Sequence, residues 1–134
     1  MARPLLLLTA MKTILIVDDE VEIAKALRRL LRKEFEVEVA HTGADALTRL
    51  EQGAVDLVLT DFRMPAMNGS ELLAEVKRRW PTTVRVMLSG YADLESSVDE
   101  GATCRFIRKP WDDRVLLSTL GQLLSGSGAE EANR

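Results

Sequence analysis

Short apolar runs alternate along the chain with segments whose apolar residues recur every three or four positions. The first run, residues 14–17, is wholly apolar and rich in β-branched side chains, which is typical of a strand covered on both faces. In the segment that follows, Ile23, Leu27, Leu30 and Leu31 share one stripe, and basic residues lie away from it. This spacing predicts an amphipathic helix behind the first strand.

The same alternation predicts four further strand–helix units. The expected strands cover residues 37–40, 57–60, 84–88 and 105–107, and the expected helices cover 42–51, the region of 72–76, 94–100 and 112–124. Thr42 with Asp45 predicts a capping box, whereas Pro81 and Gly101 mark helix ends. Five strands alternating with five helices indicate a doubly wound α/β fold of the (βα)5 type, with a parallel sheet.

A chain of 134 residues is long enough for one domain with its own core. We assign residues 11–124 to that domain, residues 1–10 to a loosely ordered extension, and residues 125–134 to a linker-like tail rich in Ser, Gly and acidic residues. The apolar run at 5–8 is shorter than the core of a secretion signal, and no stretch is long enough for a membrane span.

Charge and cysteine content exclude several classes of partner. The formal net charge is −3, so the domain lacks the basic field that nucleic acid or an anionic membrane requires. The single cysteine, Cys104, excludes an internal disulfide and fits a reducing compartment, so we expect a cytoplasmic protein. We interpret Cys104 as a small core residue, Trp111 as a packing residue and His41 as a surface residue.

Polar residues stand where four of the expected strands end. Asp18 and Asp19 follow the first strand, Asp61 the third, Ser89 the fourth and Lys109 the fifth. In doubly wound sheets the functional crevice lies at these carboxyl ends. Any one of these acids taken alone is as well explained as a cap for the next helix, but the joint pattern is not.

Three converging carboxylates need compensation, because two such charges about 4 Å apart repel by roughly 4 kcal/mol at an effective dielectric near 20. They must be protonated, salt-bridged or bound to a cation, and oxygen ligands of this kind favour Mg²⁺. Lys109 and the Ser89 hydroxyl would suit a tetrahedral anion. The set predicts a phosphoryl site in which Asp61 is the nucleophile and forms an acyl phosphate.

Four stretches carry a family resemblance: ILIVDDE at 14–20, LTDFRMPAMNG at 59–69, VMLSGYA at 86–92 and FIRKPWD at 106–112. With these motifs in this order, residues 12–124 resemble the receiver domain of the two-component response-regulator family. The resemblance implies a flavodoxin-like fold with strand order 2-1-3-4-5. It also implies a regulatory domain of bacterial signalling that catalyses only its own aspartyl phosphorylation and dephosphorylation, and is not a conventional enzyme.

The resemblance also implies a role for each matching residue. Asp61 corresponds to the phospho-acceptor and Lys109 to the pocket lysine. Asp18, Asp19, Asp61 and the backbone carbonyl of Arg63 correspond to the ligands of Mg²⁺, for which Mn²⁺ is the substitute. The Lys109–Pro110 bond is implied to be cis.

Two further positions correspond to residues that respond to the phosphoryl group. Ser89 matches the hydroxyl residue that contacts that group and shifts on activation, and Phe106 matches the aromatic switch, although a packing role in the core is equally open. We expect Arg63 and Tyr91 to modulate the site, Arg63 by altering dephosphorylation.

The expected phosphodonor is a histidine kinase or a histidine phosphotransfer protein. The output goes to a separate downstream protein or to an effector domain, through the face formed by the helix at 94–100, the strand at 105–107 and the helix at 112–124. A homodimer through this face is one option, but the segment between Ser89 and Lys109 is short for the family. Two alternatives are a pseudo-receiver that binds partners without phosphorylation, and a phosphohydrolase of the haloacid dehalogenase type. The hydrolase would carry a second acid where this chain has Arg63.

Overall fold

The computed structural model describes residues 11–90 and 104–125. Its elements, in chain order, are β1 (Thr13–Val17), α2 (Val21–Leu31), β2 (Glu36–Ala40), α3 (Gly43–Glu51), β3 (Leu57–Asp61), α4 (Gly69–Arg79), β4 (Val84–Ser89), β5 (Arg105–Arg108) and α6 (Asp113–Leu123). The extension at 1–10, the helix predicted at 94–100, Tyr91 and residues 126–134 lie outside the described residues.

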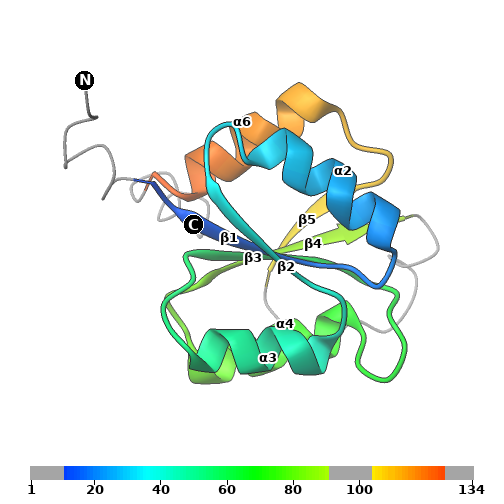
Figure 1. The fold of residues 1–134 in the computed structure, drawn as a ribbon, viewed down its shortest axis with the longest axis vertical. Helices are drawn as coiled ribbons and strands as arrows, with labels where there is room; N and C mark the ends of the chain where they lie inside the picture. Colours follow the sequence, from blue (N-terminus) through cyan, green and yellow to red (C-terminus); the bar gives the residue numbers. More distant parts are fainter. Residues whose placement is uncertain (1–10, 91–103, 126–134) are drawn as a thin grey trace.

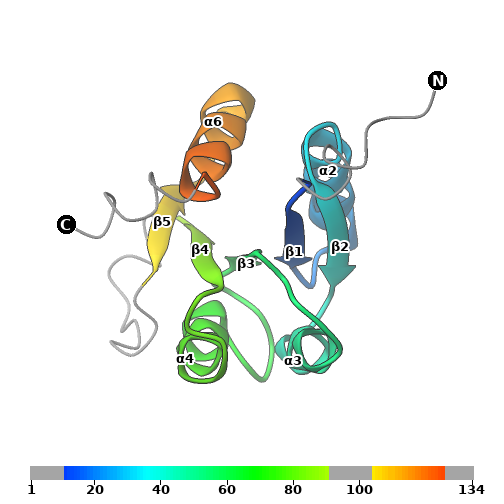
Figure 2. The ribbon, with the colours of Figure 1, turned by 90° about the vertical axis from the view of Figure 1, so that its left-hand side faces the viewer.

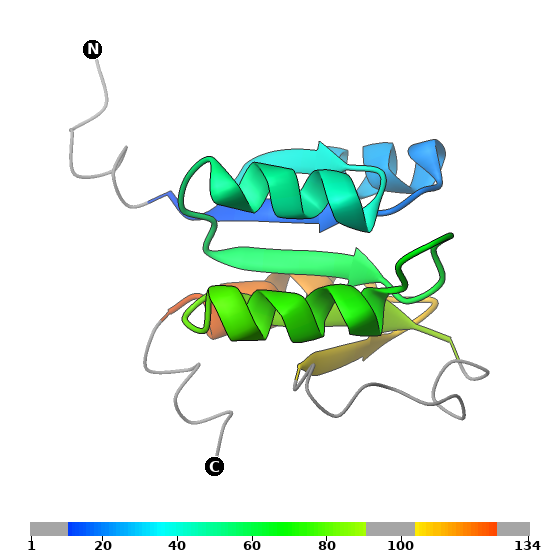
Figure 3. The same cartoon turned by 90° about the horizontal axis from the view of Figure 1, so that it is seen from below.

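The five strands form one parallel sheet in the order β2-β1-β3-β4-β5, which confirms the predicted doubly wound fold and its strand order. Helices α2 and α6 cover one face of the sheet, and α3 and α4 cover the other (Figures 1 and 2). The strands run in the same direction, so their carboxyl ends share one edge (Figure 3). This edge is where the sequence places its candidate chemistry.

Alternating residues of the central strands build two separate cores. On β3, Leu57 and Leu59 pack toward α2 and α6, whereas Val58 packs toward α3 and α4. All three are fully buried, as expected for a strand covered on both faces. On α2 the residues buried toward the sheet are Ala24, Leu27 and Leu31, with Ile23 and Leu30 partly buried beside them. The predicted stripe is therefore correct in phase, and Ala24 extends it on one side.

Strand β5 departs from the expectation for a buried strand. It is an edge strand with a neighbour on one side only, and Phe106 is 40% exposed. The interpretation of Phe106 as a core-packing residue is therefore wrong. Its backbone partner, Met87 on β4, is fully buried, because β4 has neighbours on both sides.

Backbone and side-chain hydrogen bonds fasten the opposite, amino-terminal edge of the sheet. The Asp56 carboxylate accepts the backbone N–H of Thr13 at 2.8 Å, and the Asp56 carbonyl accepts that of Val84 at 3.0 Å. One residue therefore joins the starts of β1, β3 and β4. Helix α6 runs back from the carboxyl ends and also finishes at this edge (Figure 3).

Candidate functional site

Asp61 is the last residue of β3 and lies at the centre of the carboxyl edge. Its side chain is only 4% exposed, because β1 and β4 flank it and the whole strand is buried. The Lys109 ammonium group, which follows β5, forms an ion pair with Asp61 Oδ1. The structure therefore brings together the predicted nucleophile and the predicted lysine, which are 48 positions apart in the sequence (109 − 61).

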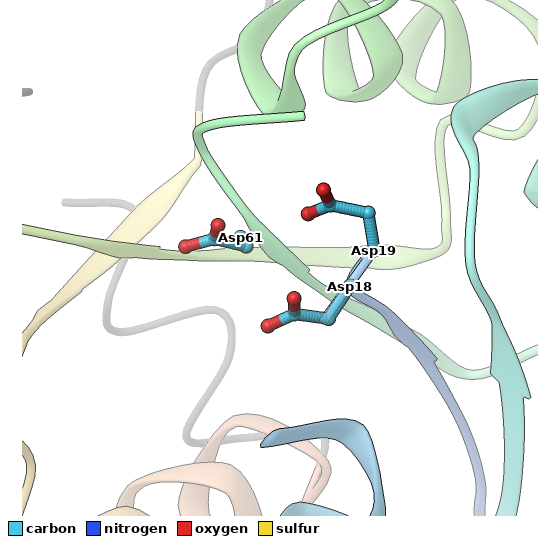
Figure 4. A group of neighbouring side chains, drawn as sticks. All are labelled: Asp18, Asp19 and Asp61. Atoms are coloured by element: carbon cyan, nitrogen blue, oxygen red, sulfur yellow. The ribbon is translucent and has the colours of Figure 1, made fainter. Parts of the chain in front are cut away.

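The acidic pair follows β1, beside Asp61. The Asp18 backbone N–H donates to the Ala40 carbonyl at 3.1 Å, and Asp18 Oδ1 accepts the Glu20 N–H at 2.8 Å. Asp18 Oδ2 is buried and has no hydrogen-bond partner among the residues that the structure describes. Asp19 is exposed. One carboxylate oxygen from each of Asp18, Asp19 and Asp61 lies within 4.8 Å of the others, around a shared space (Figure 4).

The electrostatics of this cluster favour a divalent cation. The pKa of Asp18 is raised to about 6, chiefly by burial and also by the charges of Asp61 and Asp19, although the Glu20 N–H and Lys109 lower it. With all three carboxylates ionised their formal charge is −3, and the ammonium group of Lys109 leaves −2. Three clustered oxygens, one of them buried without a partner, are a donor set that fits a hard divalent ion such as Mg²⁺.

Ser89 ends β4 at the same edge. Its side chain is 1% exposed, and its hydroxyl has no hydrogen-bond partner within residues 11–90 and 104–125. Its carbonyl accepts the Lys109 backbone N–H at 2.9 Å, which places the serine beside the lysine. The Lys109–Pro110 peptide bond is cis, as the resemblance implies. A buried hydroxyl thus ends the strand next to that of Asp61, and an ammonium group pairs with the Asp61 carboxylate; these are groups that suit the binding of a tetrahedral anion.

The β3–α4 loop is held tightly against Asp61. Gly69 donates its N–H to the Phe62 carbonyl at 2.8 Å, and a Cβ added at Gly69 would lie 2.3 Å from the Asp61 carbonyl oxygen. Asn68 caps α4 through a complete capping box with Glu71, a signal that the sequence carries as Asn-x-x-Glu. Ala66 adopts a left-handed φ of 68° within the loop. Because Gly69 lies so close to the Asp61 carbonyl, only a residue without Cβ fits at position 69.

Arg63 follows Asp61 by two residues, and its side chain is exposed on the loop. With Phe62, Met64, Pro65 and Asn68 it lines a shallow depression of about 400 Å³ at the rim of the site. This position is consistent with an influence of Arg63 on access to Asp61.

A model of the response regulator receiver domain matches residues 14–121 of the chain. The chain belongs to this family. Receiver domains are regulatory units of two-component systems and not conventional enzymes, which confirms the coarse function predicted from the motifs. The match lends no support to a haloacid dehalogenase-type hydrolase.

Known proteins with similar receiver domains include a hydrogenase transcriptional regulatory protein, HoxA, from Cupriavidus necator, which is 39% identical over 88% of this chain and 25% of its own length. A CpxR homolog from Haemophilus influenzae, a transcriptional regulatory protein, is 33% identical over 92% of this chain and 55% of its own length. The chain thus spans between a quarter and about half of these relatives.

Solved structures of receiver domains have the same fold as this chain. A CheY-like response regulator receiver domain protein from Methanospirillum hungatei superposes with a TM-score of 0.81 at 34% identity, over 91% of this chain and 99% of that one. The signal receiver domain of an HD domain-containing protein from Pseudomonas fluorescens gives 0.79 at 32% identity, over 89% and 98%. Within the described part of this receiver, no helix is long and apolar enough to cross a membrane.

Three residues to which the sequence analysis assigns no chemical role differ in their surroundings. Cys104 is partly buried against the α3/α4 core, and burial raises the pKa of its thiol to about 11, which keeps it protonated and inert. Trp111 packs against the α2/α6 core and donates Nε1–H to Asp113 at 3.1 Å. His41 is exposed, as predicted, yet its ring contacts the backbone of Asp18, a contact that the sequence did not indicate.

Proposed function

We propose that this receiver domain accepts a phosphoryl group on Asp61 from a histidine kinase or a histidine phosphotransfer protein, in a Mg²⁺-dependent step. The proposal rests on the Asp61 carboxylate, which is nearly buried and forms an ion pair with Lys109. One of its oxygens lies within 4.8 Å of an oxygen of Asp18 and of an oxygen of Asp19. Asp18, Asp19, Asp61 and the Arg63 carbonyl would hold the ion. When bound, Mg²⁺ supplies positive charge that neutralises the transferring oxygens.

The transfer would use the groups of this chain as follows. An oxygen of Asp61 attacks the phosphorus of a phosphohistidine, and a new O–P bond forms as the P–N bond breaks. The electron pair of the P–N bond returns to the imidazole nitrogen, which takes a proton from solvent. Lys109 balances charge on the phosphoryl oxygens, while the unpartnered Ser89 hydroxyl donates to one of them.

The switch would follow from the new Ser89 contact. Movement of Ser89 toward the phosphoryl group displaces the end of β4, and Phe106 on the neighbouring strand responds. Phe106 and Val115 are among the exposed large hydrophobic residues of the described chain, at 40% and 59%. They support an output or dimer surface on β5 and α6, to which a downstream protein or an effector domain binds. A histidine kinase or phosphotransfer protein as phosphodonor, together with the free thiol of Cys104, is consistent with a cytoplasmic location.

Intact mass spectrometry tests the phospho-acceptor. With Mg²⁺ and a small phosphodonor such as acetyl phosphate, the wild-type protein should gain a single labile phosphate, and Asp61→Asn should gain none, because an amide is not a nucleophile for phosphorus. Asp45→Asn, an exposed acid on α3, is the matched control and should keep the adduct. A wild-type protein without any adduct would instead be a pseudo-receiver, and steady release of phosphate from an ester substrate would indicate a hydrolase.

Arg63 should slow the loss of the phosphate. Its exposed side chain stands on the rim beside Asp61, so its truncation opens the path of an attacking water. We expect Arg63→Ala to shorten the lifetime of phospho-Asp61 about three- to tenfold, since tenfold corresponds to roughly 1.4 kcal/mol in the barrier. The decay of the adduct after removal of the donor measures this. Arg78→Ala, which removes an exposed guanidinium on α4, is the control, and equal lifetimes for both variants would contradict the role of Arg63.

A further inference from the structure

His41, the only histidine in the sequence, follows β2 directly and faces the loop that carries the acidic pair. Its Nδ1 lies 2.9 Å from the backbone carbonyl oxygen of Asp18. Because a carbonyl oxygen can only accept, Nδ1 must carry a proton and donate it. The imidazole ring therefore connects the residue after β2 to the residue after β1.

The bond from His41 fixes a part of Asp18 that the other bonds leave free. The backbone N–H of Asp18 is held by Ala40, and its Oδ1 is held by the N–H of Glu20. The carbonyl that His41 binds belongs to the peptide group joining Asp18 to Asp19. Since a peptide group is planar, fixing its carbonyl also fixes where the Cα of Asp19, and hence the start of its side chain, lies.

We propose that His41 is a positioning residue for the acidic cluster, and that its Nδ1–H bond to the Asp18 carbonyl holds the Asp18–Asp19 peptide in the orientation that directs both carboxylates at a divalent cation. The inference rests on the proposed Mg²⁺ site and extends it to the end of β2. Because the ring is exposed and outside both cores, its removal should weaken the binding of the cation without lowering the stability of the fold.

Three substitutions at position 41 distinguish the effect of the hydrogen bond to Asp18 from the effect of side-chain size. His41→Ala removes the donor. His41→Asn keeps an N–H donor attached to Cγ, close to the position of Nδ1, and His41→Gln carries the same amide one methylene further out. Calorimetric titration with Mg²⁺ gives the affinity of each variant, and urea unfolding in EDTA gives the stability of each without the metal.

We expect His41→Ala and His41→Gln to weaken Mg²⁺ binding about three- to tenfold, the range that loss of one ordinary hydrogen bond covers. His41→Asn should stay within about twofold of the wild type, because the donor is retained. All three variants should unfold in EDTA at nearly the wild-type urea concentration. A lower stability with unchanged Mg²⁺ affinity would make His41 a structural residue only and overturn the inference.

The single histidine also permits a direct test of the bond. In protein labelled with ¹⁵N-histidine, the neutral ring should show protonated Nδ1 and unprotonated Nε2, and a ring protonated at Nε2 instead would overturn the inference. If the wild-type protein binds no Mg²⁺, the proposed function fails and this inference fails with it. If the wild type binds Mg²⁺ and His41→Ala binds it equally well, the inference alone fails.

Discussion

Replacement of Gly69 by alanine is expected to destabilise the domain by about 2–3 kcal/mol, the upper part of the range for overpacking a tight site. The added Cβ would lie 2.3 Å from the Asp61 carbonyl oxygen and 3.0 Å from the Phe62 Cα. Both neighbours are backbone atoms of β3 and its continuation, so neither can rotate away. The strain has to be relieved by moving the start of α4 or the end of β3.

Either movement displaces the proposed nucleophile, so Gly69→Ala should also slow phosphorylation of the remaining folded protein by at least about tenfold, since small misplacements at a reacting centre are costly. Urea unfolding and the rate of adduct formation measure the two effects. Gly121→Ala is the matched control, because a Cβ there meets no atom within 4 Å and lies inside α6. The free energy of unfolding of this variant should rise by about 0.5–1 kcal/mol. Equal effects at the two glycines would contradict the packing argument.

Asp18→Asn is expected to stabilise the metal-free domain by about 1–2 kcal/mol at neutral pH. The pKa of Asp18 is raised from 3.8 to about 6, first by burial and then by its acidic neighbours, so its ionised form is disfavoured in the folded state. A shift of that size corresponds to roughly 3 kcal/mol, and the gain is smaller because an amide accepts the Glu20 N–H less strongly than a carboxylate does. Asparagine keeps the shape of the side chain and removes the charge.

The pH dependence of this gain has a defined sign. Because the folded protein holds the Asp18 proton more tightly than the unfolded chain, this group lowers wild-type stability as pH rises from about 4 to above 6. The advantage of Asp18→Asn should therefore be greatest above about pH 6 and vanish below about pH 4. Urea unfolding in EDTA across this range measures it.

Two further observations complete the test of Asp18. Added Mg²⁺ should stabilise the wild type but leave Asp18→Asn unchanged, because ligand binding stabilises only a fold that binds it. Asp56→Asn serves as the control of opposite sign: its carboxylate accepts the Thr13 N–H at the other edge of the sheet, so this variant should lose stability. An Asp18→Asn protein that is less stable than the wild type in EDTA would show that the carboxylate is needed for folding.

The sequence predicted the centre of the sheet well because β1 and β3 are apolar on both faces, whereas the helices are apolar on one side only. The β3 segment shows this most clearly, since every residue from Leu57 to Asp61 is buried and the predicted strand differs from the observed one only at Asp61. The residues of the site were predictable because the strands are parallel, so the residues that follow the strands converge at one edge of the sheet. Register and packing did not need to be known.

What the sequence could not predict depends on tertiary packing. Phe106 looks like a core residue by composition, but its strand lies at the edge of the sheet and leaves it 40% exposed. The contact between His41 and Asp18 depends on the pairing of Val17 with Ala40 in the β1–β2 register, which no local pattern reveals. By contrast, the Asn68/Glu71 capping box has a local signal in the sequence, Asn-x-x-Glu, which the spacing of apolar residues alone does not reveal.

Both ends of the described chain lie at the edge of the sheet opposite Asp61, because β1 starts there and α6 finishes there. A five-residue strand spans about 16 Å, so a domain tethered after residue 125 would be anchored at least one sheet length from the phosphoryl chemistry. A domain joined by a linker shorter than that span could not contact the modified side chain. For such a domain we expect communication to pass through displacement of packed elements, with α6, which leads to the tether, as the link between the two.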